Sequence, residues 1–332
     1  MTDLEDARAL LPRWGFPPDT AIAPVRDQGT NNRTFLVRHQ QQRYVLQISQ
    51  FLSAAEVRAE HRILRCLRRS RLPLQVPDPV AAGDGQTVIE TAAGPATVCR
   101  WLPGVTPAMA GPAAFRRYGR AAGLLSAALA EVPLDAAVRD WRTDPLWIWP
   151  DGLPVGVLCG ELRTAGMSAG PADLIEAAAR RTGRWWPAAA GLPVQVIHGD
   201  LAPSNMLAAR QTGEVTGLLD FEFAGAGFRV QDLLAALYNS PALDAPDWPQ
   251  VTTAVVRGWV SARPLEAAEV SALPELLIAR SLGSVLWRAA RWRAGLASFS
   301  EVTTRAGRLE TIAGVAGRGD AFASVVAAAA RP

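Results

Sequence analysis

The sequence predicts an α+β fold of two lobes, a strand-rich lobe over residues 1–102 and a mainly helical lobe over residues 103–332. Segments with the period-2 alternation of half-buried strands concentrate before residue 102, and longer segments with helical periodicity concentrate after it. Leu102-Pro103-Gly104 separates the two halves as a short hinge. A chain of 332 residues is also long for one compact core and fits two packed lobes.

The N-terminal lobe is predicted to hold five strands, with one long helix inserted after the third. Residues 4–14 have the pattern of a short helix that precedes them. The predicted strands cover residues 22–25, 34–39, 43–49, 87–91 and 96–101, with polar turns at 27–32 and 40–42. Residues 54–68 are predicted as the long helix because Val57, Leu64 and Leu67 recur at helical spacing.

The C-terminal lobe is predicted to be helical apart from one central stretch. The predicted helices cover residues 113–132, 171–188, 230–239, 247–261, 267–294 and 300–313. Short apolar runs at 194–197, 206–207 and 215–219 are predicted as small strands between them. The alanine-rich end at 327–330 is expected to fray.

Composition and charge indicate an ordinary globular chain, with 49% apolar and 20% charged residues. Residues 1–102 hold 13 arginines against 10 acidic residues, and residues 103–332 hold 21 against 21, which together give the net charge of +3. Neither half carries the basic excess of a nucleic-acid or membrane-surface binder, so neither partner is expected.

The lack of lysine, of paired cysteines and of a long apolar segment excludes several kinds of site and location. All 34 basic residues are arginine, which excludes a Schiff base, a P-loop lysine and a kinase-type strand lysine. Cys66, Cys99 and Cys159 are odd in number and widely spaced, which argues against a disulfide framework or a zinc site. The N-terminus is acidic and no apolar run approaches 18 residues. The protein is therefore expected in the cytoplasm.

Residues 198–232 carry three polar residues at an informative spacing. Asp200 is followed by Asn205 and then by Asp220, and each stands beside a short apolar run. Phosphoryl transfer needs a carboxylate to orient the attacking hydroxyl, and an amide and a carboxylate to hold the magnesium that neutralises the phosphates. The pattern therefore predicts a phosphoryl-transfer site. The alternative is an exposed loop in which Asp and Asn cap turns.

The wider motif supports the same prediction. Its residues are His198-Gly199-Asp200 with Asn205, then Leu219-Asp220-Phe221-Glu222, then Asp232-Leu233. This set resembles the aminoglycoside phosphotransferase family, which includes choline kinases and the second type of homoserine kinase. Residues 31–37, Asn-Asn-Arg-Thr-Phe-Leu-Val, resemble the nucleotide loop of homoserine-kinase-like members. The resemblance implies a protein-kinase-like fold with an antiparallel sheet in the N-terminal lobe, and a small-molecule kinase that uses ATP and Mg²⁺.

The resemblance also implies roles for the residues of the motif. Asp200 stands where the family has its catalytic base, and Asn205 and Asp220 stand where it has its magnesium ligands. His198 is expected to pack beneath the loop as structural support. Asp232 either caps the helix that it begins or accepts backbone N–H groups of the Asp200 loop.

Nucleotide-binding residues are expected at three places in the N-terminal lobe. The turn at 28–32 offers backbone N–H groups and side-chain amides to phosphates, although a plain hairpin turn has the same composition. Strand alternation puts Val45 and Gln47 on one face, where Val45 would cover the adenine and Gln47 would point at the phosphates. The strand before the hinge would read the adenine edge, or would simply connect the lobes. The full expected set is Gly29, Thr30, Asn31, Asn32, Arg33, Val45, Gln47, Cys99 and Trp101.

Gln47 is the main departure from the family pattern, because it occupies the position of the kinase lysine. Without that lysine, Glu60 on the following helix lacks its usual ion-pair partner. It is expected to pair with Arg33 or Arg58 instead, or to form a hydrogen bond with Gln47. Arg33 or a second metal is then left to supply the missing charge at the phosphates. The departure also leaves open an alternative function, a nucleotide-binding pseudokinase without transfer activity.

The acceptor is predicted to be a small molecule with a hydroxyl group. Arg288 and Arg291, three residues apart in a predicted helix, would share a face and clamp a carboxylate, or would form a solvated face. A polycationic aminoglycoside would instead require carboxylates. Homoserine or a related hydroxy amino acid is therefore favoured, with antibiotics, choline-like amines and sugars as alternatives, and GTP as an alternative to ATP. Glu222 is either a supporting group near the metal and acceptor or a salt-bridge partner.

Overall fold

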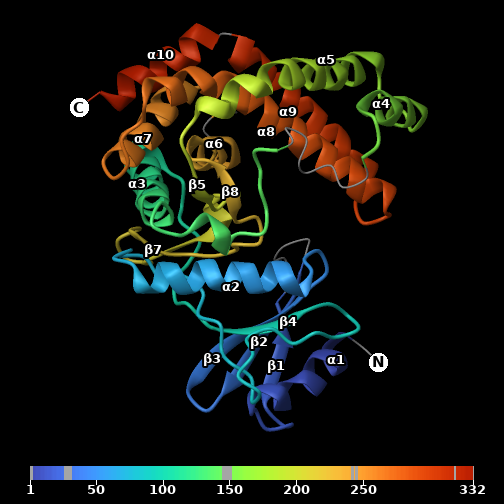
Figure 1. Cartoon of the computed structure of the whole chain (residues 1–332), viewed down its shortest axis with the longest axis vertical. Coiled ribbons are helices and arrows are strands. Elements are labelled where there is room, and N and C mark those ends of the chain that lie inside the picture. The colour runs from blue at the N-terminus through green and yellow to red at the C-terminus, as the bar shows by residue number, and fades with distance from the viewer. Residues whose placement is uncertain are drawn as a thin grey trace.

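The computed structural model describes residues 3–25, 32–143, 152–240, 243, 246–317 and 319–331. A strand-rich part and a helical part follow one another along the long axis of the molecule, with helix α2 (Ala54–Arg69) between them (Figure 1). This arrangement confirms the predicted α+β fold of two parts.

The N-terminal sheet has four antiparallel strands in the order β1-β2-β3-β4. The strands are β1 (Ala21–Pro24), β2 (Asn32–His39), β3 (Gln42–Ser49) and β4 (Ala96–Arg100). Alternate residues such as Val37, Leu46 and Val98 are fully buried. They pack against the short helices α1 (Asp3–Leu10) and η1 (Leu11–Trp14) in one hydrophobic cluster. The opposite residues of β3, which include Val45 and Gln47, face a cleft.

The predicted fifth strand at residues 87–91 does not form. Ile89 pairs with Ala96 of β4 through two backbone hydrogen bonds, whereas Cys99 on the same edge pairs with Pro79. Two separate segments therefore share the outer edge of β4. Neither has enough of that edge to extend its pairing into a regular strand.

Helix α2 begins with a capping box, in which Ser53 and Glu56 each satisfy the other's backbone N–H group. Its apolar face, which includes Ile63, Leu64 and Leu67, belongs to the same hydrophobic cluster as the core of the helical part. The segment after α2 also reaches that part, since Gln75 exchanges backbone hydrogen bonds with residues 216 and 218. The helix therefore joins the sheet to the helical part through buried apolar contacts.

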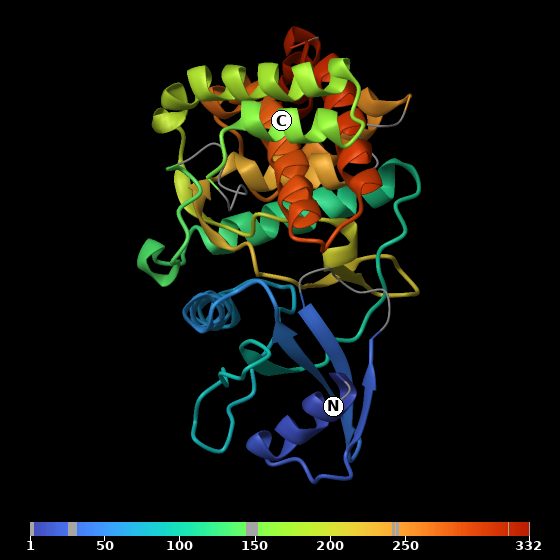
Figure 2. The ribbon, with the colours of Figure 1, turned by 90° about the vertical axis from the view of Figure 1, so that its right-hand side faces the viewer.

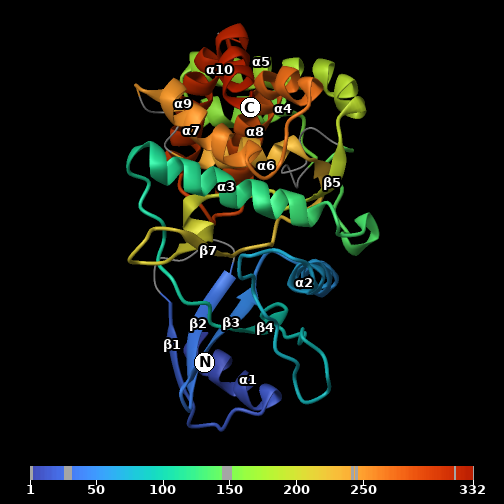
Figure 3. The same cartoon turned by 90° about the vertical axis from the view of Figure 1, so that its left-hand side faces the viewer.

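The helical part contains α3 (Gly111–Leu129), η2 (Leu134–Ala136), α4 (Val155–Thr164), α5 (Ala169–Trp185), η3 (Trp186–Gly191), η4 (Pro203–Asn205), α6 (Val230–Asn239), α7 (Trp248–Val260), α8 (Ala267–Arg293), α9 (Phe299–Gly317) and α10 (Gly319–Ala330). Figure 2 shows α8 and α9 running steeply beneath α5, and Figure 3 shows α3 crossing the base of these helices, above α2 and β7. Helix α4 was not predicted. The expected fraying at 327–330 is wrong, because Val326 and Ala329 of α10 are buried against the other helices.

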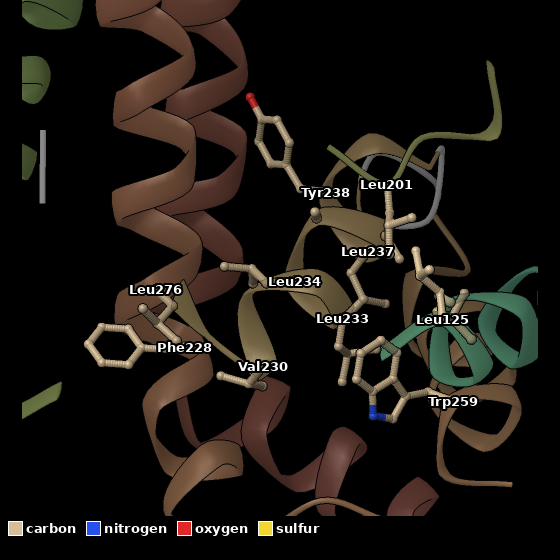
Figure 4. Close-up of a cluster of buried hydrophobic side chains, with 14 of the residues drawn as sticks. Leu125, Leu201, Phe228, Val230, Leu233, Leu234, Leu237, Tyr238, Trp259 and Leu276 are labelled. Carbon is tan, nitrogen blue, oxygen red and sulfur yellow. The ribbon is translucent and has the colours of Figure 1, made fainter. Parts of the chain in front are cut away.

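Close packing fixes α3 against α7. A Cβ atom on Gly119 would lie 2.0 Å from the Val255 carbonyl oxygen, and one on Gly123 would lie 2.5 Å from that of Trp259. Glycine is therefore required where the two backbones meet. The neighbouring core, with Leu125, Trp259 and the apolar face of α6, is shown in Figure 4.

Two small antiparallel sheets hold the loops between α5 and α6. Strand β5 (Val194–Ile197) pairs with β8 (Gly225–Phe228), and β6 (Met206–Ala208) pairs with β7 (Val215–Leu218). Strand β8 was not predicted, because its sequence Gly-Ala-Gly-Phe has no strand-like pattern. Helix α8 is long and apolar enough to cross a membrane, but 67% of that stretch is buried, as in the core helix of a globular protein.

Candidate active site

A cleft of about 1290 Å³ lies between the N-terminal sheet and the helical part. The sheet contributes Val45, Gln47, Thr97 and Cys99; the central loops contribute Asp200, Asn205, Asp220 and Glu222; the helices contribute Tyr238, Asn239, Arg280, Ser284, Trp287, Arg288, Arg305 and Arg308. The predicted motif residues and the predicted strand residues thus face one cavity.

The loop after β5 is fixed by a buried carboxylate. Asp232, which is fully buried in the first turn of α6, accepts the backbone N–H groups of His198 at 3.0 Å and Gly199 at 2.9 Å. Gly199 has a φ of +82°, and a Cβ there would lie 2.7 Å from the Phe223 carbonyl oxygen, so the turn requires glycine. Of the two roles considered for Asp232, the structure shows contact with the loop backbone.

His198 lies beneath this loop and is fully buried. Its Nε2 is 3.0 Å from the Leu219 carbonyl oxygen, and its Nδ1 is 3.3 Å from the backbone nitrogen of Asp200. A neutral ring with its proton on Nε2 satisfies both partners, since it donates to the carbonyl and accepts from the amide. Burial lowers the pKa of His198, which agrees with a neutral structural side chain.

The Asp200 carboxylate is held by donors from three different elements. Its Oδ1 accepts from Arg280 Nη2 at 2.7 Å and Asn239 Nδ2 at 2.9 Å, and its Oδ2 is 3.3 Å from Asn205 Nδ2. The other Arg280 nitrogen, Nη1, donates to the Gly199 carbonyl at 2.8 Å. The carboxylate therefore stands in a fixed orientation at the base of the cleft, as a group that aligns a hydroxyl requires.

Asp220 lies two residues after the end of β7 and occupies an unusual backbone position, with a φ of +62°. Burial raises the pKa of Asp220, and the neighbouring carboxylates of Glu222, Asp200 and Glu60 raise it further. The Leu219 N–H donates to the Asn205 carbonyl at 2.8 Å, which ties the two predicted ligand residues together. Asp220 is thus a half-buried acid with an unfavourable backbone conformation and other acids nearby, and a bound cation would stabilise it.

These residues fit Mg²⁺ held jointly with phosphates. Within the described ranges, no three His, Cys, Asp or Glu side chains gather closely enough to hold a metal by themselves. Mg²⁺ commonly takes one or two protein carboxylates, with water and substrate phosphates completing its shell. Asp220 offers a carboxylate, and the amide of Asn205 donates through nitrogen to Asp200, which leaves its oxygen to face a cation.

The missing strand lysine leaves Glu60 without an ion-pair partner among the residues that the structure describes. Arg33 pairs with Asp3 at 2.7 Å, and Arg58 pairs with Glu90 at 2.7 Å, so neither takes the place expected for it beside Glu60. Burial, followed by repulsion from Glu222, raises the pKa of Glu60 to about 8.

Glu222 and Arg139 connect the lobes beside Glu60. Asn32 Nδ2 of β2 donates to Glu222 Oε2 at 3.0 Å, so Glu222 has a partner from the nucleotide side of the cleft. Arg139 Nη2 donates to Glu56 Oε1 at 2.8 Å, and Arg139 Nη1 donates to the Glu222 carbonyl at 3.4 Å. The N-terminal end of α2 is thereby attached to the helical part.

The expected nucleotide-binding residues are only partly described. Gly29, Thr30 and Asn31 lie outside the described residues, whereas Asn32, Arg33, Val45, Gln47, Cys99 and Trp101 line the cleft. The expectation for the hinge needs correction, because the N–H groups of Arg100 and Trp101 already donate to Asp78 and Arg43 carbonyls. The Leu102 N–H, one residue further along, has no hydrogen-bond acceptor within the described chain and lies at the cleft.

Arg288 and Arg291 do not face the cleft together. Arg288 lines it and pairs with Glu301 at 3.1 Å, whereas the Arg291 guanidinium lies over the Trp287 ring and does not line it. Arg291 lies about one helical turn beyond Trp287, past the stretch of α8 from Arg280 to Arg288 that lines the cleft. Two arginines of α9, Arg305 and Arg308, occupy this end of the cleft instead.

Sequence reasoning missed Arg280, Asn239, Arg305 and Arg308. One signal for Arg280 was available, because it precedes Arg288 by eight residues and so lies on the same face of α8. Asn239 gave no comparable signal, since an asparagine at a helix end is common. The arginines of α9 could be placed only once the packing of α9 on α8 was known.

A profile of the phosphotransferase enzyme family (APH) matches residues 23–270 of this chain. The homoserine kinase of Xanthobacter autotrophicus is 31% identical over 225 residues, which cover 66% of this chain and 65% of that protein. The homoserine kinase of Gluconacetobacter diazotrophicus is 29% identical over 299 residues, which cover 88% of each chain. The alignment to the first relative thus spans just under two thirds of that relative's length.

Solved structures show the same fold at lower identity. The microcompartment-associated aminopropanol kinase superposes with a TM-score of 0.74 at 22% identity, covering 97% of this chain and 99% of that one. The GDP complex of aminoglycoside 2'-phosphotransferase-IIIa superposes with a TM-score of 0.65 at 16% identity, covering 95% and 99%. These two likenesses support the fold, and the motif residues discussed above all lie within the range that the family profile matches.

Proposed function

Because this chain belongs to the phosphotransferase enzyme family, whose members are small-molecule kinases, we propose that it transfers the γ-phosphate of ATP to the hydroxyl of homoserine or a related hydroxy amino acid. The observation that carries the proposal is the Asp200 carboxylate, oriented by Arg280, Asn239 and Asn205 where the loops and the arginine-lined end of the cleft meet. Homoserine kinases about 30% identical to this chain support the choice of acceptor.

The chemistry requires one proton transfer and one phosphoryl transfer. The acceptor oxygen forms a bond to the γ-phosphorus as the bond from that phosphorus to the β,γ-bridging oxygen breaks, which leaves ADP. Asp200 aligns the hydroxyl and receives its proton. Asn205 and Asp220 would hold Mg²⁺, which neutralises charge on the phosphates when it is bound. Val45 and the hinge at Leu102 would hold the base of the nucleotide, which is adenine in ATP and guanine in GTP.

The competing function is that of a pseudokinase, which would bind nucleotide without transferring phosphate. Gln47 suggests it, because this residue stands where kinases have a lysine. Against it, Asp200, Asn205 and Asp220 are all present and face one cleft. Asn239 and Arg280 also hold the Asp200 carboxylate in a fixed orientation. The positive charge that Gln47 lacks would contact the nucleotide phosphates. Its absence leaves the base Asp200 and the two expected magnesium ligands, Asn205 and Asp220, in place.

The test is transfer of label from γ-labelled ATP, with Mg²⁺, across homoserine, choline, a simple sugar and an aminoglycoside. We expect label in homoserine. Label in the aminoglycoside alone would refute the hydroxy amino acid as acceptor, and label in none of the four, with MgATP still bound, would support the pseudokinase. A thermal shift with MgATP, measured on the same preparation, separates a chain that binds nucleotide from one that does not.

A further inference from the structure

The end of the cleft beyond Asp200 is lined by arginines from two helices. Arg280 and Arg288 come from α8, and Arg305 and Arg308 come from the neighbouring α9. The acidic residues that line the cleft are Asp3, Glu60, Asp200, Asp220 and Glu222, and they lie at its nucleotide side and floor. Two further arginines, Arg33 and Arg100, line the sheet side of the cleft, where they pair with Asp3 and Asp78. Beyond Asp200 the charged groups that line the cleft are guanidinium groups.

We propose that Arg305 and Arg308, supported by Arg288, bind the carboxylate of the acceptor, and so select hydroxy acids over amino alcohols. This inference rests on the proposed function, because it assigns one end of the same acceptor site. Guanidinium groups bind carboxylates through two parallel hydrogen bonds, which suits recognition of a small planar anion.

Arg305 supplies the first observation. It is half-buried at the cleft and forms no ion pair with any residue that the structure describes, whereas Arg288 one helix away is paired with Glu301. Burial, and after it repulsion from Arg305, lowers the pKa of Arg288, which places the two guanidinium groups near one another. Two cations brought together beside a single carboxylate leave positive charge that an anionic ligand would balance.

Tyr238 supplies a second and independent observation. Its hydroxyl group is buried without a hydrogen-bond partner in the described structure, although the residue lines the cleft. Figure 4 shows this hydroxyl pointing away from Leu233 and Leu237 of the hydrophobic core. A buried hydroxyl without a partner is costly, so an oxygen-bearing ligand at this place would stabilise it.

Tyr238 also links Arg308 to the base. The Arg308 guanidinium lies 4.2 Å from the centre of the Tyr238 ring and donates to the Tyr238 carbonyl. Arg280 lies 5.7 Å from the same ring, and the next residue, Asn239, donates to Asp200. Arg308 therefore contacts Tyr238, and the next residue in the chain, Asn239, contacts the Asp200 carboxylate.

The spacing along α8 matches a short hydroxy acid. Arg280 contacts Asp200, Ser284 lines the cleft one turn later, and Arg288 lines it one turn beyond that. One turn of helix rises about 5.4 Å, which is comparable to the length of a four-carbon hydroxy acid. An acceptor with its hydroxyl at Asp200 would thus place its carboxylate near Ser284 and the arginines of α9.

The experiment compares homoserine with 3-aminopropan-1-ol, which is homoserine without its carboxylate. The variants are Arg305→Gln and Arg308→Gln, with the exposed Arg257→Gln on α7 as the matched control. We expect each α9 variant to raise the KM for homoserine about 10- to 100-fold, while the KM for ATP and the kcat/KM for 3-aminopropan-1-ol stay within about twofold. Arg257→Gln should change none of these constants.

The outcomes separate this inference from the proposed function. Equal loss with both acceptors, or no loss in Arg305→Gln, would overturn the carboxylate site even if the wild type phosphorylates homoserine. A wild type that phosphorylates only the amino alcohol would refute both. A wild type that phosphorylates a different hydroxy acid, such as glycerate, with the same dependence on Arg305 would refute homoserine and support the site.

Binding measured without turnover gives a further readout. In the presence of ADP and Mg²⁺, calorimetry should show homoserine binding weakened in Arg305→Gln by the same factor as its KM. Retained wild-type affinity in Arg305→Gln would overturn the inference. Arg308→Gln removes a hydrogen bond to the Tyr238 carbonyl and could lose stability for that reason. Arg305 forms no hydrogen bond in the described structure, so the result for Arg305→Gln tests the inference even if Arg308→Gln does not fold.

Discussion

Arg280 holds both sides of the turn that carries Asp200, since its Nη1 donates to the Gly199 carbonyl at 2.8 Å and its Nη2 donates to Asp200 Oδ1 at 2.7 Å. The arginine comes from the middle of α8, and the turn comes from the end of β5. Helix α8 is thereby connected directly to the group proposed as the base. The orientation of that carboxylate depends on the packing of the helical part.

Replacement of Arg280 should lower turnover without preventing nucleotide binding. Arg280→Ala removes two hydrogen bonds to the turn, one of them to a charged group, so we expect kcat to fall about 10- to 100-fold. Arg280→Lys keeps the charge but can make only one of these bonds well, and it should retain more activity. Steady-state kinetics measure both. An Arg280→Ala enzyme with wild-type kcat would show that the turn needs no such support.

Removal of Asp220 should act through the metal. Asp220→Asn replaces a carboxylate ligand with an amide, and we expect the Mg²⁺ concentration for half-maximal activity to rise by more than the 10- to 100-fold typical of an outer-shell partner. EDTA should abolish activity in the wild type, and excess Mg²⁺ should restore it. An unchanged Mg²⁺ dependence in Asp220→Asn would exclude this residue as a ligand. Glu310→Gln, an exposed change on α9, is the control.

Asp232 should contribute to stability more than to chemistry. It accepts two backbone N–H groups while fully buried, and Asp232→Asn has only one amide oxygen for them and adds a donor that finds no acceptor there. We expect the free energy of unfolding to fall by about 1–3 kcal/mol, as measured by urea denaturation. If Asp232→Asn unfolds at the same urea concentration as the wild type, these bonds do not stabilise the loop.

Glu60 should make stability fall as pH rises. Burial raises its pKa in the folded chain from 4.5 to about 8, so the folded state holds this proton more tightly than the unfolded state does. Its contribution is complete below pH 4.5 and is lost as the pH rises through about 8. Glu60→Gln stays neutral throughout. We therefore expect the variant to gain stability over the wild type across this range.

Urea denaturation at several pH values between 4.5 and 8 would measure the Glu60 effect. Asp220 and Asp232 also have raised pKa values, so the difference between Glu60→Gln and the wild type is the quantity to follow. A difference that does not change with pH would mean that Glu60 titrates alike in the folded and unfolded chains. Glu310→Gln again provides a neutral exposed control.

Local sequence patterns were sufficient to predict the elements whose structure depends on residues close together in the chain. The helix at 230–239 was predicted with the bounds that α6 has, because its apolar residues and its start at an Asp-containing turn are local features. The loops around Asp200 and Asp220 were placed for the same reason. The resemblance to the aminoglycoside phosphotransferase family is confirmed by the profile match.

Contacts between distant segments could not be predicted from such patterns. Arg280 meets Asp200 across 80 residues, and β8 forms only because β5 lies beside it. The expectation that Arg288 and Arg291 bind the acceptor together was wrong, since the turns of α8 that line the cleft depend on how the other elements pack around that helix. The fifth strand failed for a similar reason, because two segments compete for one edge of β4.

The most direct test of the account is label transfer from γ-labelled ATP to homoserine by the wild type and by Asp200→Asn, with MgATP binding followed by thermal shift in both. The account predicts labelled homoserine from the wild type, a loss of about a hundred- to ten-thousand-fold in Asp200→Asn, and a retained nucleotide shift in the variant. Labelled homoserine formed at the same rate by both proteins, or no label from a wild type that binds MgATP, would contradict it.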